Sequence, residues 1–315
     1  MLKFTLKRVV GLVPIMLMVT LIMFLLLQLT PGDPARVAAG ADASEEMVQL
    51  FRERMGLDQP LLQQYGSWVA GLVRGDFGTS LQYGTPVSEM ILRRAPVTIS
   101  LTLTATILGL LVAVPAAMAA AYKPDRIVDR STVFATTFGI SLPDFFIGLL
   151  LVLVFAIEFD VLPALGYVPF TESPLRWSIH MILPAVTLGA AVAAELTRHM
   201  RASLRDIVGM EYMNTARVKG LGTVRVMGKH ALRNAAVPVV TVLGLQIRRL
   251  LGGTVIVERI FSLDGLGSLI VQGVFARDFP VILGVGIVSA LTVVVVNLAV
   301  DLSYGFLDPR VRVGA

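Results

Sequence analysis

Three charged residues lie inside stretches of this sequence that are otherwise apolar. Asp144 interrupts the run at about 133–157, and the adjacent Arg248 and Arg249 stand about twelve residues into the run at about 236–257. A charge at the centre of a membrane-spanning helix costs about 2.5–3.5 kcal/mol on insertion scales, so it usually faces a cavity or a partner. Guanidinium groups pair well with carboxylates. One interpretation is therefore that at least one arginine lines a path and attracts a carboxylate.

A second interpretation stays open for the same residues. Adjacent helix positions differ by about 100°, so the two arginines cannot point the same way. Either can pair with Asp144, with Asp301 or with an acid of a partner subunit. Asp144 follows Pro143 and can instead cap a helix at a proline break. Gly252 and Gly253 come soon after the arginines, and they favour close packing of helices, with a constriction of the path as the alternative.

Patterns typical of enzymes are missing. The sequence has no cysteine, which removes thiolate chemistry, disulfides and cysteine metal sites. Its three histidines are isolated, and there is no HExxH motif. The nearest match to a phosphate-binding loop, GTVRVMGKH at 222–230, has the wrong glycine spacing and lacks Ser or Thr after the lysine. We expect no catalytic residue, no metal site and no cofactor bound by this chain.

The elements that must position these residues are membrane-spanning helices. Charged residues make up 16% of the chain, against about 25% in a soluble domain, and the mean hydropathy is +0.77. A helix needs about 20 mostly apolar residues to cross the bilayer core. Six stretches meet this requirement, which predicts an all-α integral membrane protein with six transmembrane helices: 9–29, 96–121, 133–157, 178–197, 236–257 and 279–300.

The distribution of basic residues predicts the orientation. With the N-terminus in the cytoplasm, 16 of the 27 Lys and Arg residues fall on the cytoplasmic side, including all five lysines. This bias is typical of cytoplasmic loops, so the net charge of +5 does not indicate nucleic acid binding. Both termini are then cytoplasmic. Residues 1–29 could alternatively be a cleaved signal peptide, but an apolar run of 21 residues exceeds the usual 7–15.

The chain divides into three predicted regions: the N-terminus with the first span (1–29), an extracytoplasmic segment (30–95) and a core domain (96–315). The segment 30–95 is too long for a plain connection. Asp42 and Glu45 suggest a capping box for one helix, and a second helix is expected to start at Pro60. This insertion is either a helical cap on the protein's own spans or a docking surface for an external partner.

Within the core domain, residues 200–235 form a polar loop between two spans. Its stretch EYMNTARVKGLG (211–222) lacks proline and predicts a short helix, with Tyr212, Thr215, Ala216 and Lys219 on one face. Gly220 and Gly222 permit a sharp turn with positive φ. Thr223 can then cap a further helix. The loop is either a solvated anchor that sets orientation or a contact surface for a soluble partner.

This loop resembles the coupling loop of permeases in binding-protein-dependent ABC importers for dipeptides, oligopeptides and nickel. The matching residues are Glu211, Tyr212, Thr215, Ala216, Arg217, Lys219 and Gly220, then His230, Arg233, Asn234 and Pro238. Further blocks occur in the family's order: PGDPA (31–35), GLDQP (56–60), RGDFGTSL (74–81), LLGGTVIVE (250–258), GLG (265–267), ARDFP (276–280) and LDPRVR (307–312). Arg248 and Arg249 depart from the small or neutral residues more common in relatives.

The resemblance implies a type I importer fold in a prokaryotic plasma membrane, with import of short peptides as the expected function. It implies a second permease subunit in a heterodimer, two cytoplasmic ATPase subunits or a fused pair that bind ATP and Mg²⁺, and an external substrate-binding protein. Helix 211–219 would sit in a cleft of an ATPase. Alternatives are the same machine carrying nickel, glutathione or a similar solute, an ion-coupled secondary transporter, for which no clear repeat is seen, and an intramembrane enzyme.

Overall fold

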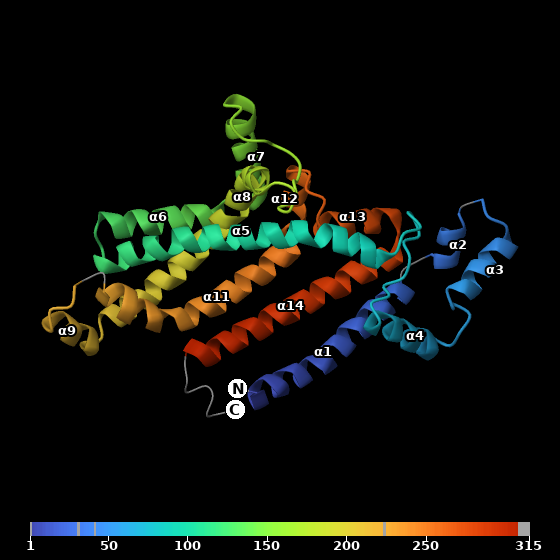
Figure 1. Ribbon diagram of the computed structural model, residues 1–315, viewed down its shortest axis with the longest axis horizontal. Helices are drawn as coiled ribbons and strands as arrows, with labels where there is room; N and C mark the ends of the chain where they lie inside the picture. The colour runs from blue at the N-terminus through green and yellow to red at the C-terminus, as the bar shows by residue number, and fades with distance from the viewer. Residues whose placement is uncertain (1, 30–31, 41, 223–224, 308–315) are drawn as a thin grey trace. The chain divides into compact units, whose positions relative to one another are not determined.

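A computed structural model describes residues 2–29, 32–40, 42–222 and 225–307, and these residues are helices joined by turns (Figure 1). A lone β-bridge joins Thr79 and Pro86. Contacts along the backbone divide the chain into two compact units. The first comprises Met1–Lys7, Ile99–Leu263 and Val295–Ala315, and the second comprises Arg8–Thr98 and Asp264–Val294. The three predicted regions follow other boundaries and stay a prediction.

The first unit holds the polar loop and the intramembrane charges. Its elements are α6 (Ile127–Ser141), α7 (Asp144–Leu151), the π-helix η1 (Val152–Glu158), α8 (Pro174–Val208), α9 (Glu211–Val218), the π-helix η2 (Val226–Ala231), α11 (Leu232–Gly253) and α12 (Val255–Ile260). The second unit holds α2 (Pro34–Ala39), α3 (Glu45–Arg54), α4 (Leu61–Val73) and α13 (Leu266–Ala276). The helices α1 (Leu2–Leu29), α5 (Val87–Tyr122) and α14 (Phe279–Leu307) contribute residues to both.

Helix α8 is the centre of the first unit, and it packs against α11, α6 and α7. The Ser173 hydroxyl accepts a hydrogen bond from the backbone of Arg176 and caps its start. Every fourth residue from Leu188 to Leu204 is buried, which makes one apolar stripe along the helix. A Cβ at Gly109 of α5 would lie 2.6 Å from Val192, so this glycine lets α5 approach α8 closely.

The second unit has its own apolar core. Val87 and Ile91 of α5 cluster with Leu269 of α13 and with Val281 and Val285 of α14. Elsewhere in the unit α4 packs on α1: the ring of Phe24 lies 5.5 Å from that of Tyr65 and 5.9 Å from that of Trp68, measured between centroids. The predicted helix after Pro60 is confirmed as α4. The segment therefore packs on a neighbouring helix, as the first of its two interpretations requires.

The third and the first of the predicted spans differ from the prediction. Among the described residues, four helices are long and apolar enough to cross a membrane: α5, α8, α11 and α14 up to Tyr304. The third predicted span is a bent pair, in which Ile127–Ser141 and Asp144–Glu158 meet at 98°. Pro143 stands at the bend, and a proline there cannot continue α6. The first predicted span corresponds to α1, of which Val10–Leu26 forms a shorter apolar helix.

Two helix boundaries differ from the sequence prediction. Ser44, not Asp42, caps α3: its hydroxyl accepts a hydrogen bond from the Met47 backbone N–H. The fifth span starts at Leu232 and ends at Gly253 instead of residue 257. Gly252 and Gly253 lower the helix propensity there, and a separate short helix, α12, starts at Val255. The boundary therefore follows the glycines more than the hydropathy of the residues beyond them.

Candidate functional sites

Helix α9 is the element predicted to contact a partner, and an acidic residue in its first turn favours a helix that begins there. Glu211 places a negative charge at the N-terminus of the helix, where the helix dipole favours it. Met213 is fully buried and holds the helix to the protein. The Tyr212 hydroxyl accepts a hydrogen bond of 2.8 Å from the side-chain amide of Asn234, at the start of α11. The hydrogen bond therefore joins α9 to the fifth span, and α9 also packs against η2, which leads into that span.

The outward side of α9 carries the residues predicted for coupling. Glu211, Tyr212, Thr215, Lys219 and Gly220 are exposed, while the side chains of Ala216 and Arg217 lie outside the described residues. Val218, which the sequence analysis did not include, is 87% exposed. Its position three residues after Thr215 could have indicated that it shares this face. We call the described exposed side chains Glu211, Tyr212, Thr215, Val218 and Lys219 the α9 face.

A glycine ends α9 as expected. Gly220 has φ of +78°, a conformation that side chains with a Cβ rarely adopt. Gly222 does not have positive φ, so only one of the two glycines makes the turn. The Gly222 carbonyl accepts hydrogen bonds from the N–H groups of Arg225 and Val226. The predicted cap, Thr223, lies outside the described residues.

A buried ion pair, not predicted from the sequence, ties α6 to α8. Asp129, in the first turn of α6, is 1% exposed and accepts two hydrogen bonds from the Arg201 guanidinium, with Nη2 to Oδ2 at 2.8 Å. The Asp125 backbone N–H donates to the same carboxylate at 2.9 Å, and Arg205 lies 3.8 Å from it. Asp129 and Arg201 lie 72 positions apart, so no local pattern could have shown their contact.

The intramembrane charges form a second, looser group. Arg249 Nη2 donates a single hydrogen bond of 3.3 Å to Asp144 Oδ2, and these side chains are 59% and 26% exposed. Asp144 is the first residue of α7, directly after the bend at Pro143. The structure thus contains one ion pair that the second sequence interpretation offered. Arg248 is half-buried, and no hydrogen bond or ion pair joins it to another described residue.

The glycines after the arginines are not packed within this chain. A Cβ built on Gly252 or on Gly253 would meet no atom within 4 Å, and both residues are exposed. Close packing of helices was the favoured interpretation; the described residues of this chain do not supply the neighbouring helix, and packing against a partner subunit stays a prediction. The two glycines instead leave an open surface beside the arginines.

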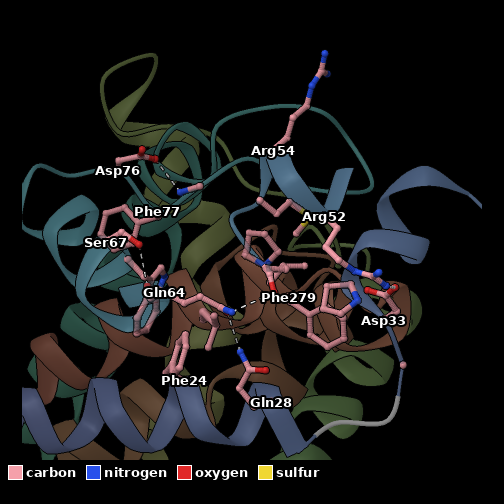
Figure 2. A pocket seen from close by; sticks show the side chains of 18 residues that line it. Phe24, Gln28, Asp33, Arg52, Arg54, Gln64, Ser67, Asp76, Phe77 and Phe279 are labelled. Carbon is pink, nitrogen blue, oxygen red and sulfur yellow. Dashed lines mark hydrogen bonds and ion pairs between the residues drawn. The ribbon is translucent and has the colours of Figure 1, made fainter. Parts of the chain in front are cut away.

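The second unit holds a cavity of about 620 Å³ that is lined by the predicted extracytoplasmic segment together with α1 and α14. Aromatic rings of Phe24, Trp68, Phe77 and Phe279 contribute to its lining. Figure 2 shows Arg52 turned toward Asp33 and Arg54 extending away from the cavity. The Arg52 guanidinium lies 2.5 Å from the Asp33 carboxylate.

The polar groups of this cavity largely bind one another. Gln28 donates to Gln64 at 3.4 Å, and Gln64 donates to the Leu57 and Gln59 carbonyls. Asp76 accepts from the Gly78 N–H (Figure 2). These contacts stabilise the segment and leave few polar atoms for a ligand.

A buried carboxylate, that of Asp278, binds the loop that follows α4. Asp278 is 1% exposed and accepts a hydrogen bond of 2.5 Å from the Ser80 hydroxyl. The backbone N–H groups of Leu81 and Gln82 donate to it at 3.2 Å. Asp278 directly precedes α14 (Phe279–Leu307), so one carboxylate holds the loop to the start of the last helix. The blocks RGDFGTSL and ARDFP are thereby joined.

The described residues contain no group of three or more His, Asp or Glu side chains that could hold a metal ion. Their ionic clusters each combine carboxylates with arginines, which satisfy them. What the arrangement offers is a set of contact surfaces and charged sites on long helices.

Comparison with known proteins shows which protein family contains this chain. The family described as "Binding-protein-dependent transport system inner membrane component" matches residues 91–313, and its N-terminal component matches residues 1–102. The chain belongs to this family. It is therefore an ABC importer permease of the inner membrane, and the family works together with binding proteins. The sequence resemblance and the all-α type I importer fold are confirmed.

Curated relatives match over nearly the whole chain. The glutathione transport system permease protein GsiC of Escherichia coli strain K12 is 41% identical over 312 residues, which covers 99% of each chain. GsiC of Salmonella choleraesuis strain SC-B67 is 42% identical over the same share. Among solved structures, an inward-facing MetNI methionine ABC transporter has a TM-score of 0.56 at 15% identity and covers 70% of this chain and 96% of that one. That likeness supports the fold alone.

Proposed function

We propose that this permease imports short peptides, with glutathione as the first candidate. Its similarity to GsiC at 41% identity across 99% of both chains is the observation that carries this proposal. Glutathione is itself a peptide of three residues, so it belongs to the substrate class expected from the sequence. Nickel stays an alternative substrate, and the uptake assay below separates it from peptides.

The permease works in a heterodimer with a second permease, above two ATPase subunits and below an external binding protein. ATP and Mg²⁺ bind to the ATPases, and this chain contributes no catalytic residue. Both of its termini are cytoplasmic, as the excess of Lys and Arg on that side supports. The cavity-bearing segment of α2 to α4 then lies outside, where the binding protein delivers substrate.

The α9 face is the contact with an ATPase subunit. Its side chains are exposed, Met213 is buried, and the Tyr212–Asn234 hydrogen bond connects the helix to α11. A displacement of α9 by the ATPase is thus passed to a span that carries Arg248 and Arg249. The helix has the exposure and the anchorage that this role requires.

Reconstituted uptake tests the substrate and the energy source. The complete importer, placed in vesicles with ATP on the ATPase side, is expected to accumulate labelled glutathione or a tripeptide only when ATP and the binding protein are both present. Accumulation driven by an ion gradient without ATP would indicate a secondary transporter. Accumulation of nickel but of no peptide would contradict the substrate class while leaving the importer assignment intact.

Cross-linking tests the α9 contact, and the absence of native cysteine makes it simple. A Val218→Cys permease is expected to cross-link to an ATPase subunit, with a yield that changes when ATP binds. The matched control is Val73→Cys on α4, which has almost the same exposure at 85%. It should not reach the ATPase. Equal cross-linking of both positions, or of neither, would contradict the contact.

A further inference from the structure

The outer face of α11 and the helix that follows it is defined by a repeated pattern of exposure. Thr241, Leu245, Arg249, Gly252 and Ile256 are exposed and recur at helical spacing. The opposite positions, Ala235, Val239, Val242, Gln246 and Leu250, are buried against the first unit. We call the exposed set the α11 face. It is the side of the fifth span that the described part of this chain leaves uncovered.

The α11 face does not suit lipid. It carries the guanidinium of Arg249, and the half-buried Arg248 stands beside it. Charged residues in a span almost always face a bundle interior or a water-filled cavity. The adjoining Gly252 and Gly253 have open space where a Cβ would stand, so a ligand can approach the backbone there. The face therefore meets water, substrate or a polar partner.

The charges on this face are not balanced within the described residues. Arg249 has one carboxylate partner, Asp144, through a single hydrogen bond at 3.3 Å. Arg248 has none. Two guanidinium groups with one carboxylate leave a positive excess, and an anion with paired oxygens can satisfy it with charge-assisted hydrogen bonds.

We propose that Arg248, Arg249 and Asp144 form a carboxylate-binding station on the transport path. The carboxylate of a short peptide binds Arg248 and competes with Asp144 for Arg249, while Gly252 and Gly253 leave room for its backbone. Asp144 keeps Arg249 neutralised when the station is empty. This inference rests on the proposed import of peptides, and it names a group of the substrate that the permease itself recognises.

The test compares a peptide with its C-terminal amide in the reconstituted importer. The measured quantity is the ratio of acid uptake to amide uptake, for wild type and for Arg248→Gln. The same binding protein serves both permeases, so its own preference cancels when the two ratios are compared. A hydrogen bond to a charged group contributes about 1.5–3 kcal/mol, so the ratio should fall about tenfold or more.

Two further variants separate recognition from structure. Arg248→Lys keeps the charge and should recover part of the acid preference. Leu245→Gln changes an exposed residue of the same face, one turn away, and should leave the ratio at its wild-type value. ATP hydrolysis stimulated by the binding protein, and co-purification of the second permease, should stay within about twofold of wild type in all three.

The outcomes distinguish the inference from the function on which it rests. An equal loss of acid and amide uptake, or no loss, overturns the station. Loss of the second permease from purified Arg248→Gln complexes also overturns it, because Arg248 would then pair with an acid of that subunit. Failure of the wild-type importer to move any peptide overturns the proposed function instead.

Discussion

Two arginine–aspartate pairs of the first unit, each of which joins two helices, differ in almost every physical respect. Arg201 and Asp129 are nearly buried, meet through two hydrogen bonds, and receive further support from a backbone N–H. Arg249 and Asp144 are partly exposed and meet through one hydrogen bond at 3.3 Å.

The burial and the number of hydrogen bonds of an ion pair therefore determine its role. A buried carboxylate that accepts three hydrogen bonds holds its partner in place, and removing it leaves a buried charge. A carboxylate held by one long contact can be exchanged for another anion. The first pair is suited to joining helices, and the second is suited to binding and releasing a ligand.

The largest effect is expected from breaking the buried pair. Asp129→Asn leaves the Arg201 guanidinium without its counter-charge and should destabilise the permease by about 3 kcal/mol, the lower end for buried pairs because Arg201 is 19% exposed. The measurement is denaturant or thermal unfolding of the purified importer, together with uptake, which should be nearly lost. Unchanged stability and uptake would mean that the pair contributes nothing to the joint between α6 and α8.

A smaller effect is expected at the turn after α9. This turn belongs to the first unit, as the buried pair does. Gly220→Val forces a β-branched residue into positive φ and costs about 1–2 kcal/mol locally. Uptake should fall several-fold while ATP hydrolysis continues. Gly222→Val is the matched control, because Gly222 also has open space around its Cα but lacks positive φ. Equal effects of the two changes would contradict a specific role of the Gly220 turn.

The smallest change in stability is expected at the open pair. Asp144→Asn should alter the free energy of unfolding by no more than about 1 kcal/mol, as for an exposed ion pair such as Arg36–Glu45, where Arg36→Gln serves as the reference. When residue 144 is neutral, the substrate carboxylate no longer has a competitor for Arg249. The acid-to-amide uptake ratio should therefore rise a few-fold. A loss of stability as large as that of Asp129→Asn would remove the distinction between the pairs.

Much of the fold could be predicted because it is encoded locally. Apolar runs of membrane length, the lack of proline in EYMNTARVKG, and the glycine at 220 each act within a few residues, and α9 with its positive-φ turn appears where they predict it. The bend at Pro143 was visible as a proline in an apolar run. Its angle was not, because the packing of α6 and α7 on α8 determines it.

The contacts between distant residues could not be predicted in the same way. Asp129 gives no local signal that it will meet Arg201, since both are ordinary charged residues near the ends of helices. Asp278 and Ser80 lie 198 positions apart, and only the fold brings them together. The intramembrane arginines are the exception, because their depth in an apolar run made them conspicuous before their contact with Asp144 was known.

The length of α8 has a practical consequence. Its 35 residues extend about 52 Å, whereas the hydrocarbon core of a bilayer measures about 30 Å. Arg201 lies beyond the apolar part at 178–197, so the pair with Asp129 belongs to the portion that extends past the hydrocarbon. Denaturants in the surrounding solution can therefore reach the helix ends that this pair joins without entering the membrane. Arg249 lies deep in its span, and on the proposed path reagents would reach it only as the substrate does.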